Sequence, residues 1–144
     1  MIEQDTVKLL RECDAGLKMG VNSIDEVLDY VHAKPMRDAL NTCKSEHNQL
    51  NAEIQSQLHR FRDDGKEPNP MASAMSWMKT NAKLMMHESD HTIADLMVDG
   101  CNMGVKTLNR YLNEYKAADE VSKDIAKRLI HQEEHLAQEM RPYL

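Results

Sequence analysis

Apolar residues recur along most of this sequence at alternating steps of three and four, the spacing that gathers them on one face of an α-helix. The first such seam comprises Leu10, Cys13, Leu17, Gly20, Ile24, Val27 and Val31, and the second comprises Met36, Leu40, Cys43, His47, Leu50, Ile54, Leu58 and Phe61. The pattern predicts helices at about residues 6–31, 35–62, 71–86, 90–117 and 120–140. We therefore expect an all-α fold, a four-helix bundle with one extra shorter helix, in a single domain over residues 1–144.

Residues that break helices divide the chain at only a few places. Pro35 suits the first turn of a helix, and the short linker before it predicts that the first two helices form an antiparallel hairpin. Ser89 or Asp90 can cap a later helix. A helix at 71–86 would cross back along the bundle between bundle helices 2 and 3. The alternative is one continuous helix over 71–117, because no Gly or Pro interrupts residues 71–99.

Composition and charge narrow the functional classes. The 144 residues carry a formal charge of −6, and the basic side chains are scattered, which argues against a nucleic-acid binder. No stretch reaches the roughly 18 apolar residues that a membrane span needs. The three cysteines Cys13, Cys43 and Cys101 form no CxxC pair, which argues against a zinc knuckle or a redox dithiol. Reduced, buried thiols in a cytoplasmic protein are the simplest interpretation.

Four stretches carry a family resemblance that covers most of the chain: residues 93–96, 100–104, 111–115 and 131–135. With this layout of helices, the chain resembles the ferritin-like superfamily, and within it small bacterial families of four-helix bundles without an assigned function. The resemblance implies a bundle with one long crossover. It also implies iron or manganese held between the helices, for storage or for protection against oxidative stress.

The ligand pattern of that family is incomplete in this sequence. A ferritin-like dinuclear site takes an inward Glu from two helices and an inward Glu-x-x-His from the other two. Residues 88–91 match the second motif, but at about 100° per residue the histidine falls opposite the apolar seam of its helix. The seams hold Gly20, Gly100 and Gly104 where carboxylates would be needed, and Asp14 only flanks its seam. At least two carboxylate ligands are therefore missing.

A small polar layer remains at mid-bundle. His47 lies at the centre of the apolar face of the second predicted helix, and Gln132 lies at the centre of the last, with Glu46 and Glu133 beside them. One interpretation is a buried His47–Gln132 hydrogen bond that fixes the register, because a buried imidazole needs a partner. The alternative is a reduced metal site of His47, Glu46 and Glu133, since imidazole and carboxylate suit iron or manganese.

His131 and His135 are spaced i, i+4, so that they could clamp one metal ion from a single helical face. The segment between them reads HQEEH, which differs from the HExxH motif of zinc proteases at the residue after the first histidine. Both histidines point away from the seam of the last helix. The pattern therefore favours solvated side chains.

Five of the eleven methionines lie between Met71 and Met86. Met71, Met75, Met78 and Met85 form a regular helical stripe, which is typical of a packing face or of a surface that binds a partner. A copper(I) site is a weaker interpretation, although methionine sulfur is a soft ligand.

The sequence offers no catalytic residues. Cys43 and His47 are one turn apart, but burial in the bundle would disfavour the thiolate that nucleophilic catalysis requires. We expect a non-catalytic bundle that acts through association or self-assembly, as a homodimer or with a protein partner. The alternative is an iron- or manganese-binding protein with a site around His47.

Overall fold

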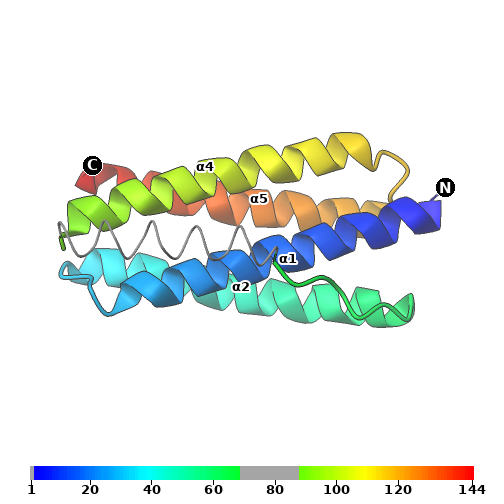
Figure 1. Cartoon of the computed structure of the whole chain (residues 1–144), viewed down its shortest axis with the longest axis horizontal. Helices are drawn as coiled ribbons and strands as arrows, with labels where there is room; N and C mark the ends of the chain where they lie inside the picture. Colours follow the sequence, from blue (N-terminus) through cyan, green and yellow to red (C-terminus); the bar gives the residue numbers. More distant parts are fainter. Residues whose placement is uncertain (1, 69–87) are drawn as a thin grey trace.

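The computed structural model describes residues 2–68 and 88–144. Within these ranges the chain forms four long helices and no strand. They are α1 (Ile2–Leu28), α2 (Lys34–Arg60), α4 (Asp90–Glu114) and α5 (Glu120–Met140), followed by the short 3₁₀ helix η1 (Arg141–Tyr143). The four long helices pack side by side along their length (Figure 1). The predicted all-α bundle of four helices is thereby confirmed, whereas the helix predicted at 71–86 lies outside the described residues.

The helices pair as two hairpins, α1 with α2 and α4 with α5, and α2 also packs on α5 (Figure 1). In Figure 1, α1 and α5 run in one direction, and α2 and α4 run in the other. The end of α2 and the start of α4 lie at opposite ends of the bundle. The connection between these two parallel helices therefore spans the length of the bundle.

Local sequence signals account for the helix ends. Ser89 has extended backbone angles, and its hydroxyl accepts a hydrogen bond from the backbone N–H of Thr92, so that Ser89 is the N-cap of α4. The chain is consequently not helical through Ser89, and the alternative of one helix over 71–117 is wrong. The carboxylate of Asp90 accepts the backbone N–H groups of His32 and Ala33 at 2.8 and 2.9 Å, which ties the turn between α1 and α2 to the start of α4.

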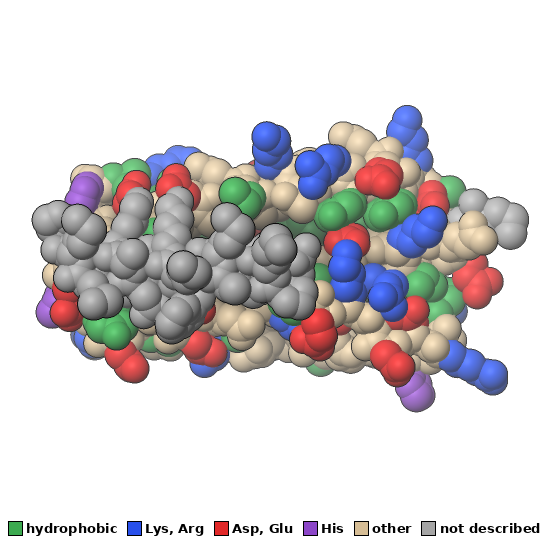
Figure 2. Space-filling view, viewed as in Figure 1, with side chains coloured by type: hydrophobic (Ala, Val, Ile, Leu, Met, Phe, Trp, Pro, Cys, Tyr) green, Lys and Arg blue, Asp and Glu red, His purple; other side chains and the backbone are tan. Residues whose placement is uncertain are grey.

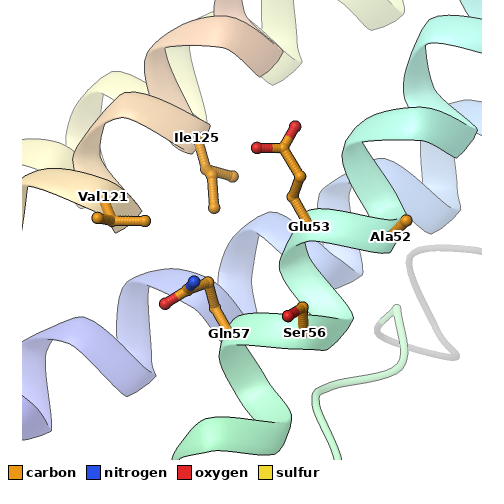
Figure 3. Close-up of a pocket in the computed structure, with 6 residues that line it drawn as sticks. All are labelled: Ala52, Glu53, Ser56, Gln57, Val121 and Ile125. Carbon is orange, nitrogen blue, oxygen red and sulfur yellow. The ribbon is translucent and has the colours of Figure 1, made fainter.

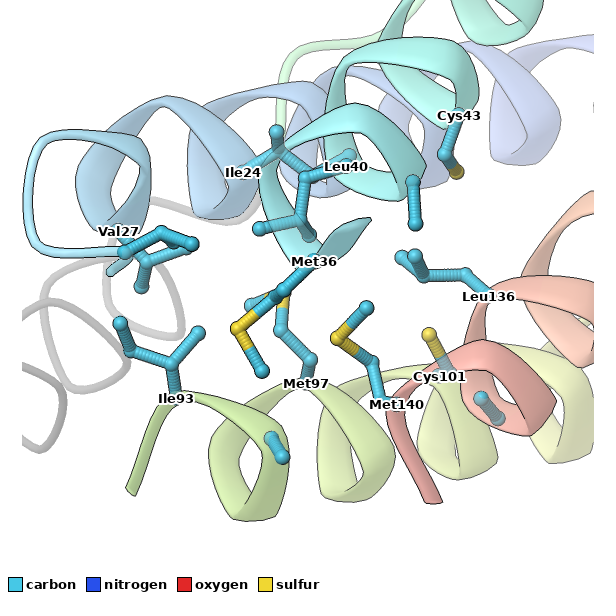
Figure 4. Close-up of a cluster of buried hydrophobic side chains, with 14 residues drawn as sticks. Ile24, Val27, Met36, Leu40, Cys43, Ile93, Met97, Cys101, Leu136 and Met140 are labelled. Atoms are coloured by element: carbon cyan, nitrogen blue, oxygen red, sulfur yellow. The ribbon is translucent and has the colours of Figure 1, made fainter. Parts of the chain in front are cut away.

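The core consists of two hydrophobic clusters that follow each other along the bundle. The first lies toward the α1–α2 turn and includes Ile24, Val27, Met36, Leu40, Ile93, Met97, Leu136 and Met140 (Figure 4). The second lies toward the α4–α5 turn and includes Leu9, Leu10, Leu17, Leu50, Ile54, Leu58, Leu108, Ile125 and Leu129. On every long helix the residues between the two clusters are less apolar, and these residues form the layer described below.

The buried face of α4 differs from the prediction. Gly100 was expected to face inward but is exposed, and Cys101 is buried in its place. Met97, Cys101, Gly104 and Leu108 follow one another at steps of four, three and four, so the observed face is as regular as the predicted one. Val121 of α5 is likewise exposed, although it lies four residues before the buried Ile125.

Asp14 was predicted only to flank the seam of its helix, but it is completely buried. Its carboxylate accepts hydrogen bonds from the Gln55 side chain at 2.9 Å, from the backbone N–H of Lys66 at 2.9 Å and from the Lys18 ammonium at 3.1 Å. A side chain at Gly65, where φ is +84°, would collide with this carboxylate. Asp14 thus holds residues 63–67, called the strap from here on, against α1.

Among the described residues, no helix combines the length and the apolar character that a membrane crossing requires. Over the described part of the face in Figure 2, Lys and Arg side chains are interspersed with Asp and Glu.

Candidate functional site

His47 on α2 is buried between the two hydrophobic clusters and is in contact with Glu133 of α5. Its Nε2 lies 3.2 Å from Glu133 Oε1, and its Nδ1 lies 3.7 Å from the Sγ of Cys43, one turn earlier on α2. The side chain of His47 is 1% exposed and that of Glu133 is 12% exposed. Both ring nitrogens of the imidazole are therefore engaged by protein groups.

The predicted hydrogen bond between His47 and Gln132 is not formed. The Gln132 amide instead donates to the backbone carbonyl of Glu46 at 3.5 Å. Its Oε1 is buried and has no hydrogen-bond partner within the described residues. Gln132 and Glu133 are neighbours on α5, and the carboxylate of Glu133 rather than the amide of Gln132 reaches the imidazole.

Two glycines give the His47–Glu133 pair its space. A Cβ atom at Gly20 of α1 would lie 3.1 Å from His47 Nε2 and 3.3 Å from Glu133 Oε1. A Cβ atom at Gly104 of α4 would lie 3.4 Å from Glu133 Oε2. Both glycines were predicted to lie on the seams of their helices. They make room for the side chains of the pair, and the pair fills that room.

Cysteine thiols flank the pair on both sides. Burial, followed by the charges of Glu133 and Glu46, raises the pKa of Cys43 to about 12. Burial and the neighbouring Glu133 carboxylate, to which its thiol hydrogen-bonds, also raise the pKa of Cys101. Both thiols are therefore protonated at neutral pH.

One arrangement of protons satisfies the side chains of Cys43, His47, Glu133 and Cys101, whereas Gln132 Oε1 has no partner among the described residues. The Cys43 thiol donates to His47 Nδ1, His47 Nε2–H donates to Glu133, and the Cys101 thiol also donates to Glu133. The buried carboxylate then accepts from two donors, and no group in this chain of hydrogen bonds lacks a partner. Such a layer supplies no nucleophile, because a protonated thiol is unreactive.

Of the three predicted metal ligands, the structure brings together His47 and Glu133. Glu46 is half-buried one residue before His47, and its charge is close enough to affect Cys43. Within residues 2–68 and 88–144, no group of three or more His, Cys, Asp or Glu side chains is placed to hold a metal ion. The geometry explains this, because Cys43 and Glu133 face opposite edges of the imidazole.

Cys101 was expected to be a buried thiol, but its place in the polar layer was not predicted, and the burial of Asp14 under the strap was missed. The sequence could have placed Cys101 on the buried face of its helix, since it lies four residues after Met97 and seven before Leu108. No sequence pattern indicates the burial of Asp14, because its partners Gln55 and Lys66 lie far along the chain.

The other sequence candidates lie outside the core. His91, of the Glu-x-x-His match at 88–91, is exposed, with Nδ1 3.3 Å from the carbonyl oxygen of Tyr143. His131 and His135 are exposed on α5, as predicted. The stripe of Met71, Met75, Met78 and Met85 lies outside the described residues.

A shallow surface hollow of about 280 Å³ lies between α2 and α5 (Figure 3). It is lined by Ala52, Glu53, Ser56, Gln57, Val121 and Ile125. The carboxylate of Glu53 is bound by the guanidinium of Arg128 at 2.6 and 2.8 Å. The charged group of this hollow is therefore already neutralised, and the lining offers neither a thiol nor an imidazole.

Comparison of the chain with protein-family models, with curated proteins and with solved structures finds no match.

Proposed function

We propose that this chain is a non-catalytic helical bundle of ferritin-like layout that acts through association, first of all with copies of itself. The parallel direction of α2 and α4 supports the layout, because ferritin-type bundles have one long crossover between their two hairpins. The crossover helix at 71–86 belongs to this proposal. A cytoplasmic location is part of it too, since Cys13, Cys43 and Cys101 are free, buried thiols.

The observation that carries the proposal is the closed polar layer. His47 and Glu133 use each other as partners, and the thiols beside them are protonated. Gly20 lies so close to the pair that a methyl group there would have to displace it, and a Cβ at Gly104 would already be in van der Waals contact with Glu133. A core arranged in this way stabilises a bundle and leaves no space for a substrate beside the His47–Glu133 pair.

The described surface supports association. Met103 on α4 is 70% exposed and Ile2 on α1 is 65% exposed. Gly100, one turn before Met103, has open space around it among the described residues. An exposed glycine beside an exposed methionine allows another backbone to approach closely.

Sedimentation velocity of the tag-free chain over a wide concentration range tests the proposal. We expect the weight-average mass to rise from that of the monomer toward that of a dimer or larger assembly as concentration increases. A mass that stays monomeric over the whole range would overturn self-association.

A second candidate function is supported by the inward position of Glu133. An imidazole and a carboxylate from two helices are the kind of ligands that iron or manganese uses between the helices of a bundle. His47 and Glu133 would hold the ion, with Glu46 as the third ligand. When bound, the metal would supply redox or storage chemistry.

Elemental analysis separates the two candidates. The tag-free chain is expressed in medium supplemented with iron and manganese, beside the variant His47→Ala. Stoichiometric metal that is lost in the variant would establish the metal-binding function. Metal-free protein with unchanged helicity would exclude it and leave the non-catalytic bundle.

A further inference from the structure

The outward face of α5 carries two histidines that the core does not use. His131 and His135 are both exposed, and α5 is regular from Glu120 to Met140. Residues four apart on a helix have Cβ atoms about 5–6 Å from each other on one face. The two imidazoles therefore project into solvent from the same side of a rigid helix.

The hydrogen bond of His135 prepares it as a ligand. Its Nε2 lies 2.8 Å from Oε1 of Glu139, one turn further along α5. The N–H at Nε2 donates to this carboxylate, so that in the neutral ring Nδ1 keeps its lone pair. A carboxylate bound to the second nitrogen is the usual partner of a metal-binding histidine, because it fixes the tautomer and raises the basicity of the ligand. His131 has no hydrogen bond or ion pair within the described residues.

We propose that His131 and His135 together bind a divalent transition-metal cation of the Zn(II), Cu(II) or Ni(II) class on the outer face of α5. Imidazole nitrogen suits these ions. Glu139 holds His135, and water occupies the remaining coordination positions. This site is independent of the polar layer and of the function proposed above. With two protein ligands, it agrees with the lack of any cluster of three ligating side chains among the described residues.

Binding at this site is coupled to folding. The helix holds the two imidazoles at a fixed spacing, whereas the unfolded chain does not. The cation therefore stabilises the native state in proportion to RT ln(1 + [cation]/Kd).

The test uses the tag-free chain and ZnCl₂ at neutral pH. Thermal unfolding is followed by circular dichroism, and zinc affinity is measured by isothermal titration calorimetry. We expect zinc to raise the midpoint of unfolding, and we expect affinity to fall by about tenfold or more in either His131→Ala or His135→Ala. Glu139→Gln should weaken zinc binding by about tenfold while both ligands remain. Alanine favours helices, so the variants should fold.

Two controls make the result specific. His59→Ala removes a single exposed histidine of α2 and should leave zinc binding unchanged. His47→Ala removes the core imidazole and should also leave it unchanged, which separates this site from a metal in the polar layer. The proposal is overturned if zinc does not bind the unaltered chain. It is equally overturned if either single alanine variant on α5 binds zinc as tightly as the unaltered chain.

Discussion

At the scale of single residues, the polar layer depends on the combination of two large polar side chains with two glycines. His47 could be placed in the core from its seam position alone, because Cys43, four residues before it, and Leu50, three residues after it, lie on the same predicted seam. Glu133 could not, since it lies one residue beside the seam position taken by Gln132. The glycines at positions 20 and 104 become understandable only when the pair that fills their space is known.

Gly20→Ala should destabilise the bundle, because the new methyl group would press on the buried His47–Glu133 pair. We expect the free energy of unfolding to fall by about 1–3 kcal/mol, the usual effect of overpacking a core. Urea unfolding measures it. Gly16→Ala is the matched control on the same helix, where a Cβ meets no described atom within 4 Å. That control should gain about 0.5–1 kcal/mol from helix propensity. Equal effects of the two substitutions would contradict the assigned packing.

His47→Leu should cost about 2–4 kcal/mol of unfolding free energy, because it leaves the buried Glu133 carboxylate without its imidazole partner. The double variant His47→Leu, Glu133→Leu should return to within about 1 kcal/mol of the unaltered chain, since no charge is then left unpaired. Urea unfolding of the four members of this cycle gives the coupling energy. Additive effects of the two substitutions would show that the pair is not coupled.

At the scale of elements, the path between α2 and α4 is set by contacts of the strap with α1. Asp14 accepts the backbone N–H of Lys66, and the guanidinium of Arg11 binds the carboxylate of Asp63 at 2.8 Å. The positive φ of Gly65 lets the chain turn against Asp14 without a clash. The strap thereby leaves the end of α2 along the side of α1, which is the direction that leads back toward the start of α4.

Asp14→Ala should release the strap, because three donors lose their buried acceptor at once. We expect faster cleavage by trypsin after Arg62 and Lys66, together with a loss of about 2 kcal/mol in the free energy of unfolding. Asp25→Ala serves as the control, because Asp25 lies on the same helix as Asp14 and forms only a surface ion pair with Lys44 of α2. The proposed role of Asp14 fails if both variants are cleaved at the same rate.

At the scale of the whole molecule, the buried thiols link stability to pH. Burial, with Glu12 and Asp14 nearby, raises the pKa of Cys13 from 9.0 to about 12, and the pKa of Cys43 also rises to about 12. In the unfolded chain these thiols ionise near pH 9, whereas in the folded chain they stay protonated. The unfolded state therefore binds fewer protons above pH 9, and the stabilisation present below that pH is lost as the pH rises toward 12.

We expect the free energy of unfolding to fall by about 1 kcal/mol for each buried thiol between pH 9 and 10, with a slope that approaches about 1.4 kcal/mol per pH unit only above pH 10. Urea unfolding at several pH values, with a reducing agent present, measures the slope. Cys13→Ala should make the fall of the unfolding free energy with pH less steep, by the contribution of one thiol. A stability that is flat from pH 8 to pH 10 would contradict the burial of the cysteines.

The sequence by itself determined the four long helices and the first hairpin, because these depend on apolar periodicity and on helix-breaking residues such as Pro35. Tertiary structure decided which of two neighbouring residues faces the core, as for Gly100 and Cys101 or for Gln132 and Glu133. Because consecutive helix residues lie about 100° apart, two neighbours can both border one apolar face, and packing against the other helices decides which of them enters the core. The burial of Asp14 was likewise decided by contacts with Gln55 and Lys66, which no local pattern encodes.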